Sequence, residues 1–164
     1  MGERFRVRVD GVRFAAAHFA TFAGGCEPLH GHSYEVAAEL EGTLTSDAWV
    51  VDFVELKSIL RGVCQEIDHR FLLQRESAVL EIDQTTTAWK VRLPSGVGYV
   101  LPAQDVVALP VDNTTAERLA EWFCAQVWEA LDDRKAGNVA AVTIEVWEGP
   151  GQRASCTRNR LPIE

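Results

Sequence analysis

The order of helix-like and strand-like periodicities constrains this fold more than any other feature of the sequence. From Asp52, which can cap a helix start, apolar side chains recur three and four residues apart, as on one face of a helix. These side chains are Leu56, Ile59, Leu60, Val63, Cys64 and Ile67. A second helix is predicted from 113–117, where Thr114 and Glu117 have capping-box spacing, to a stop near 136–138. Its wide apolar stripe indicates that it lies on a sheet.

Strand-like alternation surrounds these two helices. Residues 5–18 alternate, and the Asp10-Gly11 pair predicts a turn, so a hairpin ending near His18 is expected. A third strand is predicted within 32–42, short β-like pieces within 75–111, and a last strand over 139–148. This order lacks the regular βαβ alternation of a parallel sheet. It predicts one α+β domain over 1–164, with an antiparallel sheet that two helices cover on one face.

Composition limits the classes of partner. The formal net charge is -8 and no basic run is present, which argues against nucleic acid. No apolar run approaches the roughly 20 residues of a membrane span, and a cytoplasmic protein is expected. The four cysteines are irregularly spaced, so disulfides are not expected. A small molecule or another protein is the better candidate partner.

Three of the four histidines lie within the first 32 residues. His30 and His32 are two residues apart, which places both rings on one side of a strand, and an adjacent strand can bring His18 beside them. Three imidazoles without a fourth protein ligand are typical of a catalytic zinc site. The plainer alternative is a turn with two solvated histidines.

Two further groups are candidates for proton transfer. Cys26 lies in a glycine-rich loop just before the paired histidines, where a nearby cation would favour its thiolate, although a small apolar loop residue is an equal alternative. Asp68 and His69 are adjacent at the end of the first helix, and a histidine oriented by a carboxylate can relay a proton. The alternative for His69 is a side chain that only complements the helix dipole.

Six segments occur along the chain in a fixed order: FAAAH (14–18), CEPLHGH (26–32), VVDFVELK (50–57), IDHRFLL (67–73), NTTAERLA (113–120) and IEVWE (144–148). In this order they resemble the 6-pyruvoyltetrahydropterin synthase family, which includes the 6-carboxytetrahydropterin synthases of queuosine biosynthesis. The resemblance implies a T-fold, with a four-stranded antiparallel sheet and two helices on one side. It also implies a homohexamer in which three subunits close each barrel and two trimers stack.

The resemblance assigns roles to individual residues. It implies that His18, His30 and His32 bind Zn²⁺, that Cys26 is the catalytic cysteine, and that Asp68 and His69 complete the proton-transfer machinery. It further implies that Glu148 anchors the pterin ring and that Thr114 and Thr115 line the pterin pocket. The expected reaction is a lyase step on 7,8-dihydroneopterin triphosphate that releases triphosphate and gives a 6-pyruvoyl or 6-carboxy tetrahydropterin.

Departures from the family pattern keep alternatives open. The sequence after Glu148 is unusual, and 75–111 forms an insertion between the helices. Glu27 is similar to the glutamate of a family branch that cleaves the dihydroneopterin side chain to 6-hydroxymethyl-dihydropterin, and otherwise it is a solvated loop charge. A pterin-binding oligomer without catalysis is the remaining alternative.

Overall fold

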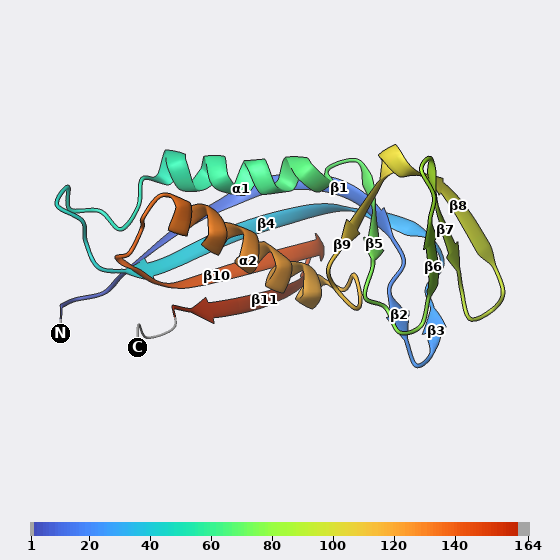
Figure 1. The fold of residues 1–164 in the computed structure, drawn as a ribbon. Coiled ribbons are helices and arrows are strands. Elements are labelled where there is room, and N and C mark those ends of the chain that lie inside the picture. Colours follow the sequence, from blue (N-terminus) through green and yellow to red (C-terminus); the bar gives the residue numbers. More distant parts are fainter. Residues whose placement is uncertain (1, 161–164) are drawn as a thin grey trace.

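The computed structural model describes residues 2–160 and contains a long sheet with two helices on one of its faces (Figure 1). Four antiparallel strands form the body of the sheet in the order β11-β10-β4-β1. They are β1 (Phe5–His18), β4 (His30–Gly42), β10 (Val139–Gly149) and β11 (Gln152–Asn159). Helices α1 (Phe53–Ile67) and α2 (Ala116–Asp133) cover them. The predicted α+β T-fold arrangement is confirmed.

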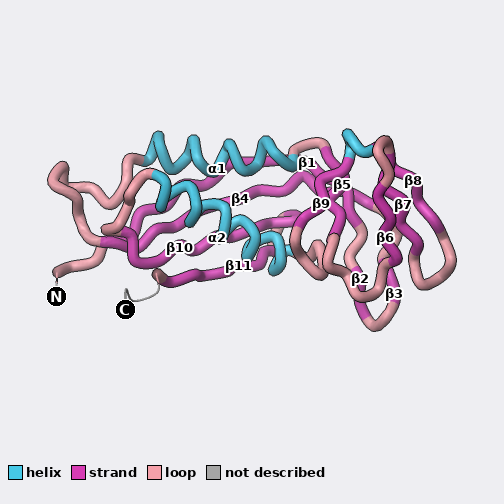
Figure 2. The backbone as a smooth tube through the Cα atoms, viewed as in Figure 1, coloured by secondary structure: helices cyan, strands magenta, loops and turns pink. Residues whose placement is uncertain are grey.

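Two shorter strands extend the sheet beyond β1. They are β5 (Arg70–Gln74) and β9 (Val106–Leu109), and both pairings, β1 with β5 and β5 with β9, are parallel. The insertion adds a separate antiparallel sheet of β6 (Glu81–Gln84), β7 (Ala88–Arg92) and β8 (Gly98–Pro102), followed by a short 3₁₀ helix, Ala103–Asp105. A small hairpin, β2 (Thr21–Phe22) and β3 (Gly25–Cys26), lies beside this sheet (Figure 2).

The predicted turn at Asp10-Gly11 was wrong, because β1 is one continuous strand. Its two halves do not pair with each other, since both pair with the equally long β4. Asp10 and Gly11 form a β-bulge, in which two residues of β1 lie opposite Ala37, and Gly11 takes a left-handed φ of 70°. The last strand was also incompletely predicted, since β11 follows β10 across a tight turn.

Both helices begin and pack largely as the sequence predicts. The Asp52 carboxylate accepts a hydrogen bond from Val54 N at 2.7 Å, so it caps α1, and the predicted apolar stripe of α1 is buried. The cap of α2 was predicted one residue early. Thr115 rather than Thr114 caps it, by accepting from Arg118 N at 3.4 Å. The Thr114 side chain is instead fully buried.

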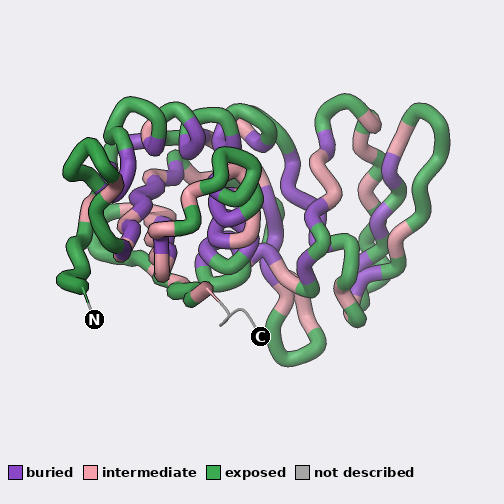
Figure 3. Tube along the Cα trace, turned by 60° about the vertical axis from the view of Figure 1, so that its left-hand side comes forward, coloured by how far each residue is buried: buried purple, intermediate pink, exposed green. Residues whose placement is uncertain are grey.

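Two hydrophobic cores hold these layers together (Figure 3). The larger core lies between the two helices and the long sheet. The smaller core lies between the long sheet and the insertion, and it is built around Phe19, Phe71, Leu73 and Trp89. The insertion is therefore packed against the strand end that carries His18. All four cysteines are free thiols, and Cys64 and Cys124 are buried. Among the described helices, none has the length and apolar character of a membrane span.

Candidate active site

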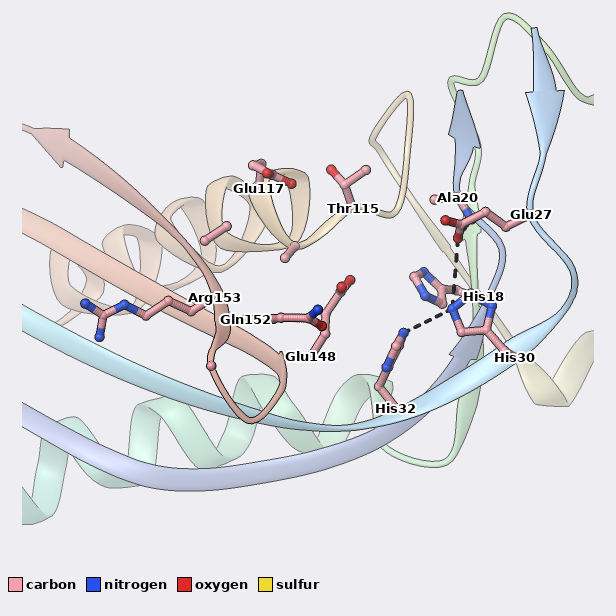
Figure 4. A pocket seen from close by; sticks show the side chains of 13 residues that line it. His18, Ala20, Glu27, His30, His32, Thr115, Glu117, Glu148, Gln152 and Arg153 are labelled. Atoms are coloured by element: carbon pink, nitrogen blue, oxygen red, sulfur yellow. Dashed lines mark hydrogen bonds and ion pairs between the residues drawn. The ribbon is translucent and has the colours of Figure 1, made fainter. Parts of the chain in front are cut away.

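The three predicted metal-ligand histidines lie together at one end of the long sheet (Figure 4). Antiparallel pairing sets His18 of β1 opposite His30 of β4, and the alternation of β4 puts His32 on the same face. The candidate ligand atoms of the three rings all lie within 4.8 Å of one another. Gly31 permits this close approach, because a Cβ there would lie 3.0 Å from the Ala16 carbonyl oxygen. The predicted convergence is thus confirmed.

Backbone carbonyls fix which ring nitrogens face the centre. His18 Nδ1 lies 2.9 Å from the Thr114 carbonyl oxygen, and His30 Nδ1 lies 2.7 Å from that of Pro28. A carbonyl only accepts, so both Nδ1 atoms carry the proton and both Nε2 atoms offer a lone pair. His18 Nε2 is buried without a hydrogen-bond partner, and the Nε2 atoms of His30 and His32 lie 3.1 Å apart. Lone pairs directed at a common point fit a bound cation.

The electrostatics of the cluster also suit a metal. Burial, together with the neighbouring rings of His30 and His32, lowers the pKa of His18 to about 4. His18 is therefore neutral at pH 7, the form that coordinates metal. Three neutral imidazoles and an open position are the donor set of catalytic zinc, so the residues present fit Zn²⁺.

The histidine cluster opens into a pocket of about 500 Å³. Three carboxylates line it: Glu27 from the loop before β4, Glu148 from the end of β10, and Glu117, which lies with Thr115 at the start of α2 (Figure 4). Burial raises the pKa of Glu148, and the charges of Glu27 and Glu117 add to this effect. A half-buried carboxylate beside a cation site can accept hydrogen bonds from a polar heterocycle and can carry a negative charge.

Glu27, rather than Cys26, points into this pocket. The Glu27 backbone N donates to the Ala20 carbonyl oxygen at 2.9 Å, and Ala20 N donates to the Glu27 carboxylate oxygen Oε2 at 3.4 Å. Glu27 Oε2 also lies 3.9 Å from His30 Nε2. Cys26 pairs with Thr21 in the small hairpin and packs against the smaller core. Burial raises the pKa of the Cys26 thiol, and the Glu27 charge raises it further. The single chain thus places a carboxylate, not a thiolate, beside the imidazoles.

Asp68 and His69 lie outside the pocket lining of their own chain. Asp68 Oδ1 accepts from Ala15 N at 2.8 Å, along the edge of β1 that faces away from β4. Asp68 Oδ2 lies 2.9 Å from His69 Nδ1, and the His69 side chain is 81% exposed. The hydrogen bond from Ala15 N, together with that from His69, lowers the pKa of Asp68. Asp68 therefore orients the His69 imidazole, but neither residue lines the pocket of the same chain.

The remaining predicted residues divide between pocket and core. Thr115 lines the pocket, whereas Thr114 lies behind His18 and takes no part in the lining. Sequence reasoning missed Gln152 and Arg153, which line the pocket from the start of β11, just after the turn that follows β10. The glycine and proline residues of 149–151 were the available signal for that turn.

The fold and the pocket together define the class, a T-fold protein with a three-histidine site flanked by carboxylates. A model of the family described as 6-pyruvoyl tetrahydropterin synthase matches residues 7–159. The chain belongs to this family.

Individual relatives carry related names. A putative 6-carboxy-5,6,7,8-tetrahydropterin synthase of Methanocaldococcus jannaschii is 33% identical over 157 residues, 94% of each chain. The 6-pyruvoyl tetrahydropterin synthase structure from Plasmodium vivax is 32% identical with a TM-score of 0.91, covering 97% of this chain and all of that one. A mutant of that enzyme replaces a glutamate described as a catalytic residue by alanine. A dihydroneopterin monophosphate aldolase of Pyrococcus furiosus is 26% identical over 83% of each chain.

Proposed function

We propose that the protein is a zinc-dependent pterin lyase that acts on 7,8-dihydroneopterin triphosphate. It gives either 6-pyruvoyl-tetrahydropterin with loss of triphosphate, or 6-carboxy-tetrahydropterin with uptake of water and loss of both triphosphate and a two-carbon aldehyde. The observation that carries this proposal is one pocket in which three imidazole Nε2 atoms adjoin Glu27 and Glu148. The names of the relatives support the same substrate class.

Glu148 is suited to hold the pterin ring. A pterin presents a ring N–H and an exocyclic amine side by side, and one carboxylate can accept from both in a bidentate pair. Burial raises the pKa of Glu148, because it destabilises the charged carboxylate. A ligand that donates two hydrogen bonds to this carboxylate would stabilise the charged form. Thr115, at the start of α2, is placed to contact the same ring. This anchor directs the pterin side chain toward the histidines.

Zn²⁺, held by His18, His30 and His32, would supply a Lewis acid that binds the side-chain hydroxyls and acidifies the adjacent C–H. Glu27 is the group of this chain placed to take that proton, since its carboxylate already lies 3.9 Å from a ligand nitrogen. The P. vivax enzyme, with its glutamate described as catalytic, supports this role. Cys26 packs against the smaller core and is not part of the pocket lining.

We assign Asp68 and His69 to the pocket of a neighbouring copy. Their own pocket does not include them, yet His69 is exposed and oriented for proton transfer. A homohexamer built from two trimers, the assembly implied by the family, would let one subunit supply this pair to the next. We place the enzyme in the cytoplasm, where its four thiols stay reduced.

A second candidate function is cleavage of the dihydroneopterin side chain to 6-hydroxymethyl-dihydropterin. The specific observation in its favour is that Glu27 faces the pocket and Cys26 does not. The similarity to an aldolase that acts on dihydroneopterin monophosphate supports it as well. In this reaction the base removes a hydroxyl proton, the bond between the first two side-chain carbons breaks, and the two-carbon aldehyde leaves.

Product analysis by mass spectrometry separates these functions. The zinc-loaded protein is incubated with 7,8-dihydroneopterin triphosphate and, separately, with dephosphorylated dihydroneopterin. Release of triphosphate with a 6-pyruvoyl or 6-carboxy product supports the lyase, whereas 6-hydroxymethyl-dihydropterin supports the second candidate. Pterin binding without turnover of either compound would contradict both functions and leave a binding oligomer. Glu148→Gln serves as a control, because loss of the anchor should weaken every pterin reaction.

A further inference from the structure

Apart from tyrosine and tryptophan side chains, the buried polar side chains of residues 2–160 form one connected group at the metal-ligand cluster. Three polar residues are buried in this part of the chain, His18, Gln74 and Thr114, and each contacts another of the three. Buried polar groups are costly unless they are paired, so a network this isolated from solvent indicates a defined arrangement. Only His18 faces the pocket. The other two stand behind it.

Gln74 is held in one orientation by the backbone. Its Nε2 lies 2.8 Å from the carbonyl oxygen of Phe19, the residue that follows His18. A carbonyl only accepts, so the amide nitrogen must face it, and the amide oxygen must face the other way. That oxygen lies 3.4 Å from Thr114 Oγ1. Gln74 therefore offers an acceptor to the Thr114 hydroxyl.

The direction of the Thr114 hydroxyl proton matters for His18. Thr114 Oγ1 lies 3.2 Å from His18 Nδ1, while the Thr114 carbonyl oxygen lies 2.9 Å from the same nitrogen. If the hydroxyl donated to Nδ1, the ring proton would move to Nε2 and occupy the lone pair that the metal needs. If the hydroxyl donates instead to the Gln74 amide oxygen, or to the Phe19 carbonyl oxygen at 3.5 Å, Nδ1 keeps its proton and Nε2 stays free. Gln74 offers the shorter of these two contacts.

We propose that Gln74 is a positioning residue that draws the Thr114 hydroxyl proton away from His18 and so holds His18 in the tautomer whose Nε2 can bind zinc. This inference rests on the zinc site of the proposed function. Gln74 is well placed for this task, because it is the last residue of β5, which runs parallel to β1. Gln74 pairs with Leu109 of β9, which lies four residues before Asn113, the neighbour of Thr114. It thus lies between the two backbone segments that carry His18 and Thr114.

The test compares zinc affinity in the full-length protein by competition with a chromophoric chelator. Gln74→Met keeps the volume of the side chain but removes its acceptor, and should weaken zinc binding about 10-fold, the lower end of what outer-shell partners of metal ligands contribute. Leu72→Met, at a buried position on the same strand, is the matched control and should stay within about 2-fold of wild type. Equal affinities of the two variants would overturn the proposal.

A double-mutant cycle tests the route through the hydroxyl. Thr114→Val removes the hydroxyl but keeps the backbone carbonyl, so in that background Gln74→Met should cost less than about 2-fold. A full 10-fold loss there would show that Gln74 acts through its packing or its bond to the Phe19 carbonyl rather than through the hydroxyl, and would overturn the proposed route.

The tautomer itself is measured by long-range ¹H–¹⁵N NMR of the His18 ring in metal-free protein. Wild type should carry the proton on Nδ1, and Gln74→Met should show an increased share of the Nε2-protonated form. A wild-type ring protonated mainly on Nε2 would overturn the proposal without any variant. Because this readout needs neither zinc nor substrate, it still tests Gln74 if wild type binds no zinc, a result that would count against the proposed function instead.

Discussion

Replacing Glu27 and Cys26 separately tests which side chain is the base. Glu27→Gln preserves the size of the side chain and an oxygen that can accept from Ala20 N, but it cannot take a proton. A positioned general base contributes about 10²- to 10⁴-fold, so kcat should fall by that factor, roughly 3 to 5 kcal/mol of barrier. KM should change little, because Glu148 rather than Glu27 is assigned to the ring.

Cys26→Ala is the matched comparison. The partly buried Cys26 packs against the smaller core, so the expected cost is roughly 1 kcal/mol of stability, with kcat within about 3-fold of wild type. The assay is steady-state turnover of 7,8-dihydroneopterin triphosphate at matched zinc content. A kcat loss in Cys26→Ala as large as that in Glu27→Gln would refute the assignment of the base.

Three further predictions concern the rest of the site. The pKa of His18 is about 4 in the metal-free folded protein and near 6.5 in the unfolded protein. Between these two pH values the unfolded state binds more protons than the folded state. The free energy of unfolding should therefore drop by about 3 kcal/mol as the pH falls from 6.5 to 4. Denaturation midpoints that fall in parallel for wild type and His18→Gln would contradict this cause. Glu148→Gln should raise KM about 10- to 100-fold with a smaller effect on kcat, and an unchanged KM would remove the pterin anchor. Co-refolding inactive Glu27→Gln and His69→Ala proteins should restore part of the activity in mixed oligomers, whereas no recovery would contradict a site shared between subunits.

The sequence predicts those features that depend on local periodicity. The apolar stripe from Leu56 to Ile67 and the Asp52 cap specified α1 without knowledge of its partners. The spacing of His30 and His32 placed both rings on one strand face, and pairing with β1 brought in His18. Local spacing was sufficient for α1 and for the shared face of His30 and His32, because these features repeat within one helix turn or one strand pleat. His18 joined them through the pairing of neighbouring strands.

Other features that depend on a distant partner were not predictable. Asp10-Gly11 has the composition of a turn, but it becomes a bulge because β4 is long enough to pair with both halves of β1. The β11 sequence QRASCTRN has little apolar alternation, since it is an edge strand of mostly exposed residues. Which of Cys26 and Glu27 faces the pocket follows from the pairing of Cys26 with Thr21, and no local pattern encodes it.

The central claim is that three Nε2 atoms of one chain bind a single zinc ion. The most direct measurement is zinc content together with X-ray absorption of purified wild type and His30→Ala. We predict one zinc per chain in wild type, with three imidazole nitrogens at about 2.0 Å, and zinc lost from His30→Ala after dialysis. Full zinc occupancy in His30→Ala, or sulfur in the wild-type coordination shell, would contradict the account.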